Sequence, residues 1–239
     1  MTMIQDYFAE LIKKFNEYHS NLLIDITKDD IHRIRTTLKR LKTFNILLDG
    51  LLFRKKDFPV ELIKLFKLAG EIRDIQIQQN ILEDYDDEYK DHLHKMYKNK
   101  MSEFKIKDSY SDELSYLISK LDKVNDYHID EQIIANIQSR IEISYDDIRS
   151  MIKNASSENL HEIRIKVKRI YYTLLMLGID DKVNELDNIQ ETIGLWHDYD
   201  VTIDCIKNFD KHENEKIIDS LKEKRDSLYS KSLELIKTL

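Results

Sequence analysis

The sequence contains very little cysteine, proline or glycine. Its 239 residues include one cysteine, one proline and four glycines. Glycine and proline are the residues that most often mark turns and interrupt regular structure, so their scarcity favours long helices joined by short loops. The single cysteine, Cys205, excludes an internal disulfide bond, and at a helical core spacing it acts as a small hydrophobic side chain.

Long apolar runs are missing as well. No stretch approaches the roughly 20 consecutive apolar residues that a helix needs to span a bilayer. The first segment, MTMIQDYFAELIKKF, is amphipathic and contains acidic residues, which is unlike a signal or transit peptide. We therefore expect a cytoplasmic protein with no part in the membrane.

The composition that remains is typical of amphipathic helices, with 35% charged and 41% hydrophobic residues. Thr27, followed three residues later by Asp30, resembles a capping box, and Pro59 suits the first turn of a helix. Apolar spacing and such caps predict nine helices, over about 3–24, 28–53, 59–83, 84–107, 110–125, 130–154, 157–178, 181–208 and 212–237.

One motif occurs twice. Residues 31–42 read IHRIRTTLKRLK, and residues 160–171 read LHEIRIKVKRIY. At an offset of 129, the copies pair His32 with His161, Arg35 with Arg164, Lys39 with Lys168, and Arg40 with Arg169. The repeat indicates an internal duplication.

The four glycines fit the same duplication. Gly50 matches Gly178, and Gly70 matches Gly194, with offsets of 128 and 124. After the second pair, Arg73 matches His197 and Asp74 matches Asp198. We therefore predict an all-α fold of two pseudo-symmetric four-helix bundles with a basic groove or channel between them. Half one covers 1–108, a connecting helix covers 109–126, and half two covers 127–239.

Each copy of the motif places its cations on the helix face opposite its apolar residues. In the first copy this face holds His32, Arg35, Lys39 and Lys42, and in the second His161, Arg164 and Lys168. Arg40 and Arg169 widen it.

These two faces are basic, whereas the rest of the chain is acidic. Residues 32–42 carry +5 and residues 161–169 carry +3, so a net charge of −7 leaves −15 for the remaining residues. Like charges one helical turn apart repel each other, which a bound polyanion would relieve. Phosphate oxygens suit both Arg forks and Lys point charges, so a linear phosphate chain along the groove is the expected ligand.

The two motifs, HRIRTTLKR with GEIRD and HEIRIKVKR with GLWHD, resemble the CHAD family, the conserved histidine α-helical domain. The resemblance covers nearly the whole chain. It implies two related four-helix bundles, binding of inorganic polyphosphate in a basic central channel, and association with polyphosphate granules. Carried over by position, the implied binding residues are His32, Arg35, Lys39, Arg40, Arg73, His161, Arg164, Lys168, Arg169 and His197. Lys42, which shares the basic face of the first copy, completes the expected site. Thr36 and Thr37 depart from the more basic pattern of many members.

Enzymatic alternatives rest on a few acidic residues. Di-metal carboxylate bundles use a Glu-x-x-His element, which Glu158-x-x-His161 fits and Asp29-x-x-His32 resembles. Helix capping explains both of these acids, however, and the surrounding cations would repel a metal ion. Asp74 and Asp198 offer one acid per half, which is little for a two-metal phosphohydrolase. We expect no enzyme activity, metal or cofactor.

Nucleic-acid binding is the other alternative, because a basic groove accepts any phosphate chain. The net charge of −7 argues against it, and aromatic residues do not alternate with cations on the basic face. A second basic stretch over 89–107 leaves open whether Lys95, Lys98 and Lys105 extend the site or belong to a solvated helix face.

Overall fold

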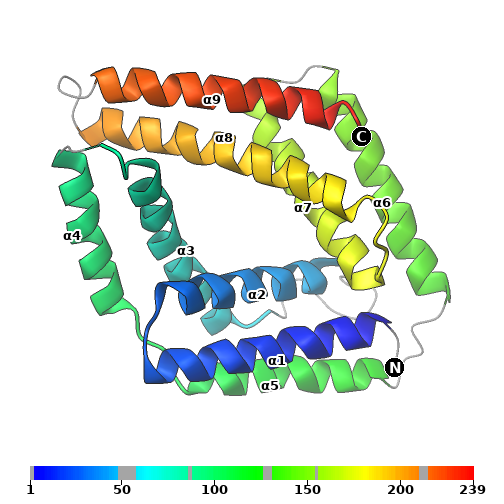
Figure 1. Ribbon diagram of the computed structural model, residues 1–239. Coiled ribbons are helices and arrows are strands. Elements are labelled where there is room, and N and C mark those ends of the chain that lie inside the picture. Colours follow the sequence, from blue (N-terminus) through cyan, green and yellow to red (C-terminus); the bar gives the residue numbers. More distant parts are fainter. Residues whose placement is uncertain (1–2, 48–57, 86–87, 126–130, 154–155, 210–214) are drawn as a thin grey trace. The chain divides into compact units, whose positions relative to one another are not determined.

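A computed structural model of the chain describes residues 3–47, 58–85, 88–125, 131–153, 156–209 and 215–239. Within these ranges all regular structure is helical, and no residue lies in a strand. The helices, labelled in Figure 1, are α1 (Met3–Ile24), α2 (Lys28–Leu47), α3 (Val60–Ile81), α4 (Glu88–Glu103), α5 (Ser109–Asn125), α6 (Glu131–Ile152), α7 (Ser157–Leu177), α8 (Val183–Phe209) and α9 (Glu215–Ile236). The predicted all-α class is confirmed, and the helices match their predicted ranges to within a few residues. Gly50 and the predicted end of the second helix lie outside the described residues.

The chain forms two compact units, and neither is continuous in sequence. Unit 1 contains Met1–Arg73, Lys100–Arg140 and Tyr172–Ile179, and unit 2 contains Asp74–Asn99, Ile141–Tyr171 and Asp180–Leu239. Helices α3, α4, α6 and α7 therefore contribute residues to both units. The units do not coincide with the predicted halves 1–108 and 127–239, because most of α4 belongs to the same unit as α8 and α9. The two pseudo-symmetric bundles and the groove between them stay predictions.

Unit 1 is organised around the first copy of the motif. Helix α2 begins with the predicted cap: the backbone N–H of Asp30 donates to Thr27 Oγ1 at 3.1 Å, and that hydroxyl donates to the Asp30 carboxylate at 2.7 Å. Helix α1 packs against both α2 and α5 (Figure 1). The side of α2 that faces the core consists of residues spaced three or four apart, Ile31, Ile34, Leu38 and Leu41, and each is at most 1% exposed. The cations of the motif consequently lie away from the core.

The second copy buries the same positions. Its core residues on α7 are Leu160, Ile163, Val167 and Ile170, again at most 1% exposed. Each lies 129 residues after its counterpart on α2. The two copies of the motif therefore bury the same face of their helices.

Helix α7 ends at a glycine, as predicted. Gly178 has a φ of 62°, in the left-handed region that favours glycine. Its N–H donates to the Leu175 carbonyl at 3.2 Å, and the N–H of Ile179 donates to the Leu174 carbonyl at 3.0 Å. These two bonds form a Schellman motif that satisfies the last carbonyls of the helix.

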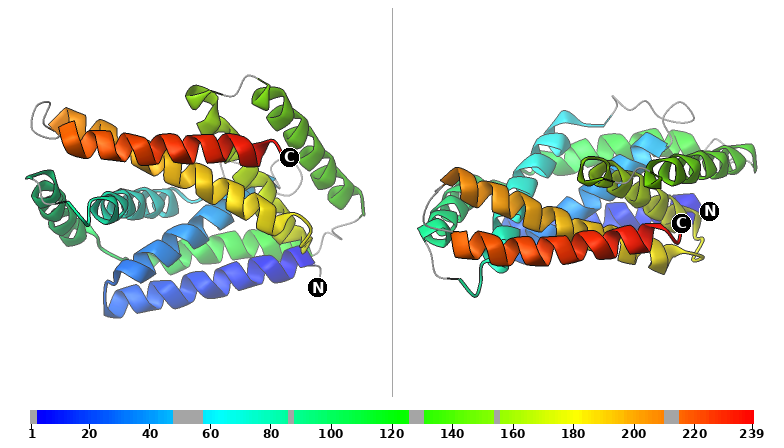
Figure 2. Two further views of the ribbon diagram at one scale, coloured as in Figure 1. Left: turned by 45° about the horizontal axis from the view of Figure 1, so that its top comes forward. Right: turned by 90° about the horizontal axis from the view of Figure 1, so that it is seen from above.

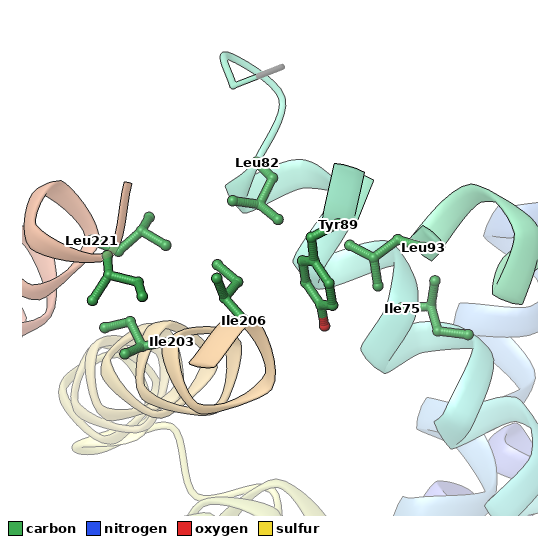
Figure 3. Packing of buried hydrophobic residues seen from close by; sticks show 8 residues of the cluster. Ile75, Leu82, Tyr89, Leu93, Ile203, Ile206 and Leu221 are labelled. Atoms are coloured by element: carbon green, nitrogen blue, oxygen red, sulfur yellow. The ribbon is translucent and has the colours of Figure 1, made fainter. Parts of the chain in front are cut away.

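The core of unit 2 joins four helices. Helices α8 and α9 lie side by side in every view (Figures 1 and 2). At one end of this pair, the ring of Tyr89 from α4 lies between Leu93 and Ile206 (Figure 3). The full cluster is Ile75, Leu82, Tyr89, Leu93, Ile203, Ile206, Ile218 and Leu221. Through this cluster, the C-terminal end of α3 and the first part of α4 pack against α8 and α9.

Candidate functional site

The first cationic cluster lies in unit 1, where Arg35 of α2 reaches across α3. A Cβ placed on Gly70 would lie 3.2 Å from Nε and 3.5 Å from Nη2 of Arg35. The guanidinium carbon of Arg35 also lies 5.2 Å from the centroid of the Phe66 ring, one helical turn before Gly70. The Nζ of Lys42 lies 5.5 Å from the same ring. Two cations of the basic face therefore converge on one aromatic ring of α3.

His32 belongs to this cluster. Its pKa lies below the usual value, first because neighbouring atoms desolvate the ring, and then because Arg73 and Arg35 lie close. The carboxylate of Asp29 opposes the shift but does not reverse it. The electrostatic potential at His32 is therefore net positive.

The second cluster lies in unit 2 and repeats the same contact. A Cβ placed on Gly194 of α8 would lie 3.0 Å from Nη2 and 3.4 Å from Nε of Arg164. As in the first cluster, the arginine comes from the motif helix and the glycine from a neighbouring helix. The position equivalent to Phe66 is Gln190, so this arginine has no aromatic ring from that position.

Two histidines complete the second cluster. The rings of His161 and His197 lie with their centroids 4.8 Å apart. Desolvation, followed by Arg164 and Lys168, lowers the pKa of His161. Desolvation, followed by Arg164 and His161, lowers the pKa of His197, with Asp200 opposing. That carboxylate also accepts a hydrogen bond from Arg225 at 3.3 Å, so it is shared with another cation.

The two clusters thus have the same construction within their own units. In each, an arginine lies over a helical glycine, and a histidine of the same motif helix sits in a net positive field. The residue three positions after the glycine also lies near that histidine: Arg73 lowers the pKa of His32, and the ring of His197 lies 4.8 Å from that of His161. Sequence reasoning paired these residues by offset, and the structure brings the members of each half together.

Three further predicted residues lie elsewhere on the basic helices. Lys39 and Arg40 lie against the ring of Tyr172, with Nζ and Cζ at 5.8 and 5.7 Å from its centroid. Arg169 is exposed on α7. The role of each in a binding site stays a prediction.

The second basic stretch is spread over both units. Lys95 and Lys98 are exposed on α4 in unit 2, and Lys105 is exposed in unit 1. Whether they extend a site stays open.

Sequence reasoning missed two features of the clusters. It matched Gly70 and Gly194 but did not assign them the role of admitting an arginine. It also missed Phe66 and Tyr172 as rings beneath the cations, because Phe66 comes from a different helix and has no aromatic counterpart in the second copy. Two glycines placed inside predicted helices were the available signal for the first feature.

The described residues offer little for a metal. Among them, no group of three or more His, Cys, Asp or Glu side chains is placed to hold an ion. The side chain of Glu158, which the di-metal alternative needs, lies outside what the structure describes. Within the same residues, no helix is long and apolar enough to cross a membrane.

The chain is similar to known proteins in both sequence and fold. The model of the CHAD domain family matches residues 6–207. A crystal structure of the CHAD domain from the plant Ricinus communis has a TM-score of 0.72 to this chain, covering 96% of this chain and 87% of the other. The two are 14% identical in sequence, so this similarity concerns the fold. No curated protein matches the chain.

Proposed function

The chain belongs to the CHAD domain family, and we propose that it binds inorganic polyphosphate through its two cationic clusters. The observation that carries the proposal is the contact that both clusters share, in which an arginine of the motif helix lies over a glycine of a neighbouring helix. In each cluster the arginine also lowers the pKa of a histidine on its own helix, so basic side chains from two helices converge at these positions. Gathering cations in this way costs free energy, which a bound anion of high charge density would recover.

The chemistry of the clusters suits phosphate. A guanidinium presents planar, paired donors that match two oxygens of one phosphate group. Arg35 and Arg164 lie against a helix backbone at a glycine, so less side-chain freedom is lost when a phosphate binds. A histidine beside each arginine can add a donor and, once protonated, a further charge.

Polyphosphate suits the clusters better than nucleic acid does. Sequence-tolerant nucleic-acid binding uses open aromatic faces on which bases stack. Here the ring of Phe66 lies beneath Arg35 and Lys42, and the ring of Tyr172 is buried beneath Lys39 and Arg40. A chain of phosphates has no bases to place and offers more charge per unit length.

Two clusters favour a long ligand over a single phosphate. A chain that engages one cluster raises the local concentration of phosphate at the other, provided that it can reach. We propose that the predicted groove allows this, and that the protein acts by binding, without cleaving the chain. A location at polyphosphate granules in the cytoplasm belongs to the same proposal.

A titration series tests the proposed function. Orthophosphate, tripolyphosphate and polyphosphates of increasing length are titrated into the protein at several salt concentrations. Affinity is expected to rise steeply with chain length and to fall linearly in log–log form with salt, as ionic contacts require. Chain lengths measured by gel after incubation should be unchanged. RNA with the same number of phosphates should compete weakly, and equal competition would favour the nucleic-acid alternative.

A further inference from the structure

We propose that Gly70 and Gly194 are positioning residues, each forming a notch in a helix that seats the phosphate-binding guanidinium of Arg35 or Arg164. This inference rests on the proposed function for the identity of the ligand. It goes further by assigning a role to two residues that cannot themselves contact phosphate through a side chain. The glycine of the neighbouring helix thus determines where each phosphate-binding guanidinium lies.

Backbone conformation does not explain these glycines. Gly70 lies within α3 and Gly194 within α8, where glycine is among the least favourable residues. In the part of the chain that the structure describes, Gly178 is the glycine with a positive φ, and these two adopt ordinary helical geometry. A residue that lowers helix stability without a conformational need points to close packing.

The atoms that pack there belong to the arginines. Around a Cβ placed on Gly70, the three nearest heavy atoms are Nε, Nη2 and Cζ of Arg35, at 3.2, 3.5 and 3.8 Å. Around one placed on Gly194, they are Nη2, Nε and Cζ of Arg164, at 3.0, 3.4 and 3.6 Å. The volume of a methyl group at each position is thus occupied by a guanidinium. This contact between an arginine and a helical glycine occurs twice, at positions that correspond in the two copies of the repeat.

The notch also fixes what the guanidinium faces. Arg35 acts electrostatically on His32, and Arg164 acts on His161 and His197. In unit 1 the guanidinium is additionally stacked near Phe66, one turn from the glycine. An added methyl group would push the guanidinium away from the helix and change its position relative to the histidine.

Alanine substitutions test the notch. Gly70→Ala and Gly194→Ala should each weaken polyphosphate binding by roughly tenfold, the effect of losing one well-placed charged hydrogen-bonding group. The melting temperature should not fall, because alanine favours the helix and the arginine side chain can move aside. Gly178→Ala is the matched control. It forces a positive φ on alanine, so it should lower the melting temperature and leave the affinity unchanged.

Coupling between the two residues separates positioning from a structural role. Arg35→Lys should weaken binding in the wild type but have little further effect in Gly70→Ala, because the guanidinium is already displaced. Equal effects of Arg35→Lys in both backgrounds would contradict the proposal.

A measurement without ligand keeps the two proposals distinguishable. In nuclear magnetic resonance titrations, the pKa of His32 should rise in Gly70→Ala, and those of His161 and His197 should rise in Gly194→Ala, because a cation has moved away. Unchanged values in both variants would overturn the notch, even if the protein binds polyphosphate. Raised values in a protein that binds no polyphosphate would keep the notch and refute the proposed function.

Discussion

The two clusters differ in how much of their charge depends on pH. Where unit 1 has Arg73, unit 2 has His197, beside His161. In the ligand-free protein, desolvation by neighbouring atoms and nearby cations hold the pKa of both histidines below the usual value of about 6.5. A bound phosphate reverses this preference, so binding should take up protons and strengthen as the pH falls. Replacing His197 with arginine should make the second cluster resemble the first.

The size of the effect follows from the number and spacing of the rings. Each histidine that becomes protonated on binding changes the affinity by up to about tenfold per pH unit, between its free and bound pKa values. Two charges 4.8 Å apart repel by about 1 kcal/mol in water-like surroundings, the limit that suits the exposed His161. Free protein therefore resists protonating both rings of the pair. With His32 included, wild-type affinity should change by up to about three powers of ten per pH unit, and that of His197→Arg by up to about two.

Calorimetry in two buffers of different ionisation enthalpy counts these protons directly. His197→Arg should take up fewer protons on binding polyphosphate and should bind more tightly than the wild type at pH 8. His94→Gln is the control, since His94 is exposed on α4 and contacts Gln79. Equal proton uptake by wild type and His197→Arg, or an affinity of the wild type that is flat between pH 5.5 and 8, would refute the reasoning.

Three further predictions concern stability. Histidines with lowered pKa values bind fewer protons in the folded state than in the unfolded state, so they contribute a loss of stability as the pH falls below about 6.5. Thermal melts of the ligand-free protein over this pH range should therefore show a smaller loss of stability in His161→Gln than in the wild type. Identical losses in the two proteins would contradict this prediction. Thr27→Ala should lower the free energy of unfolding by about 1 kcal/mol in urea titrations, because it removes the cap of α2, whereas Thr27→Ser should restore most of it. Leu93→Ala should cost about 2–5 kcal/mol by creating a cavity, while Lys95→Ala on the exposed side of α4 should stay within about 0.5 kcal/mol, and similar costs for the two would contradict the core of unit 2.

Much of the local structure could be predicted from the sequence because local rules determine it. Apolar spacing on 31–41 identified the face of α2 that is buried, and Thr27 marked where that helix begins. Gly178 marked the end of α7, where a left-handed residue is needed. The offset of the repeat then identified the corresponding buried face of α7.

Which helices pack together could not be predicted in the same way. An apolar face predicts that one side of a helix is buried, but it does not identify the helix that packs against it. Helix α4 lies in the first half of the sequence, yet Tyr89 and Leu93 pack with Ile203 and Ile206 of α8. The contact of Arg35 with Gly70 was equally hidden, because the lack of a side chain does not reveal which neighbour fills the space.

Charge reversal tests the central claim most directly, namely that the cations of these two clusters hold polyphosphate. The variant Arg35→Glu/Arg164→Glu is compared with Lys64→Glu/Lys222→Glu, which alters the net charge equally at lysines that lie outside both motifs and are already paired with acids. Both variants should melt near the wild-type temperature. The arginine variant should lose polyphosphate binding, and the lysine variant should retain it. A folded arginine variant that binds with wild-type affinity, or equal losses in both variants, would contradict the account.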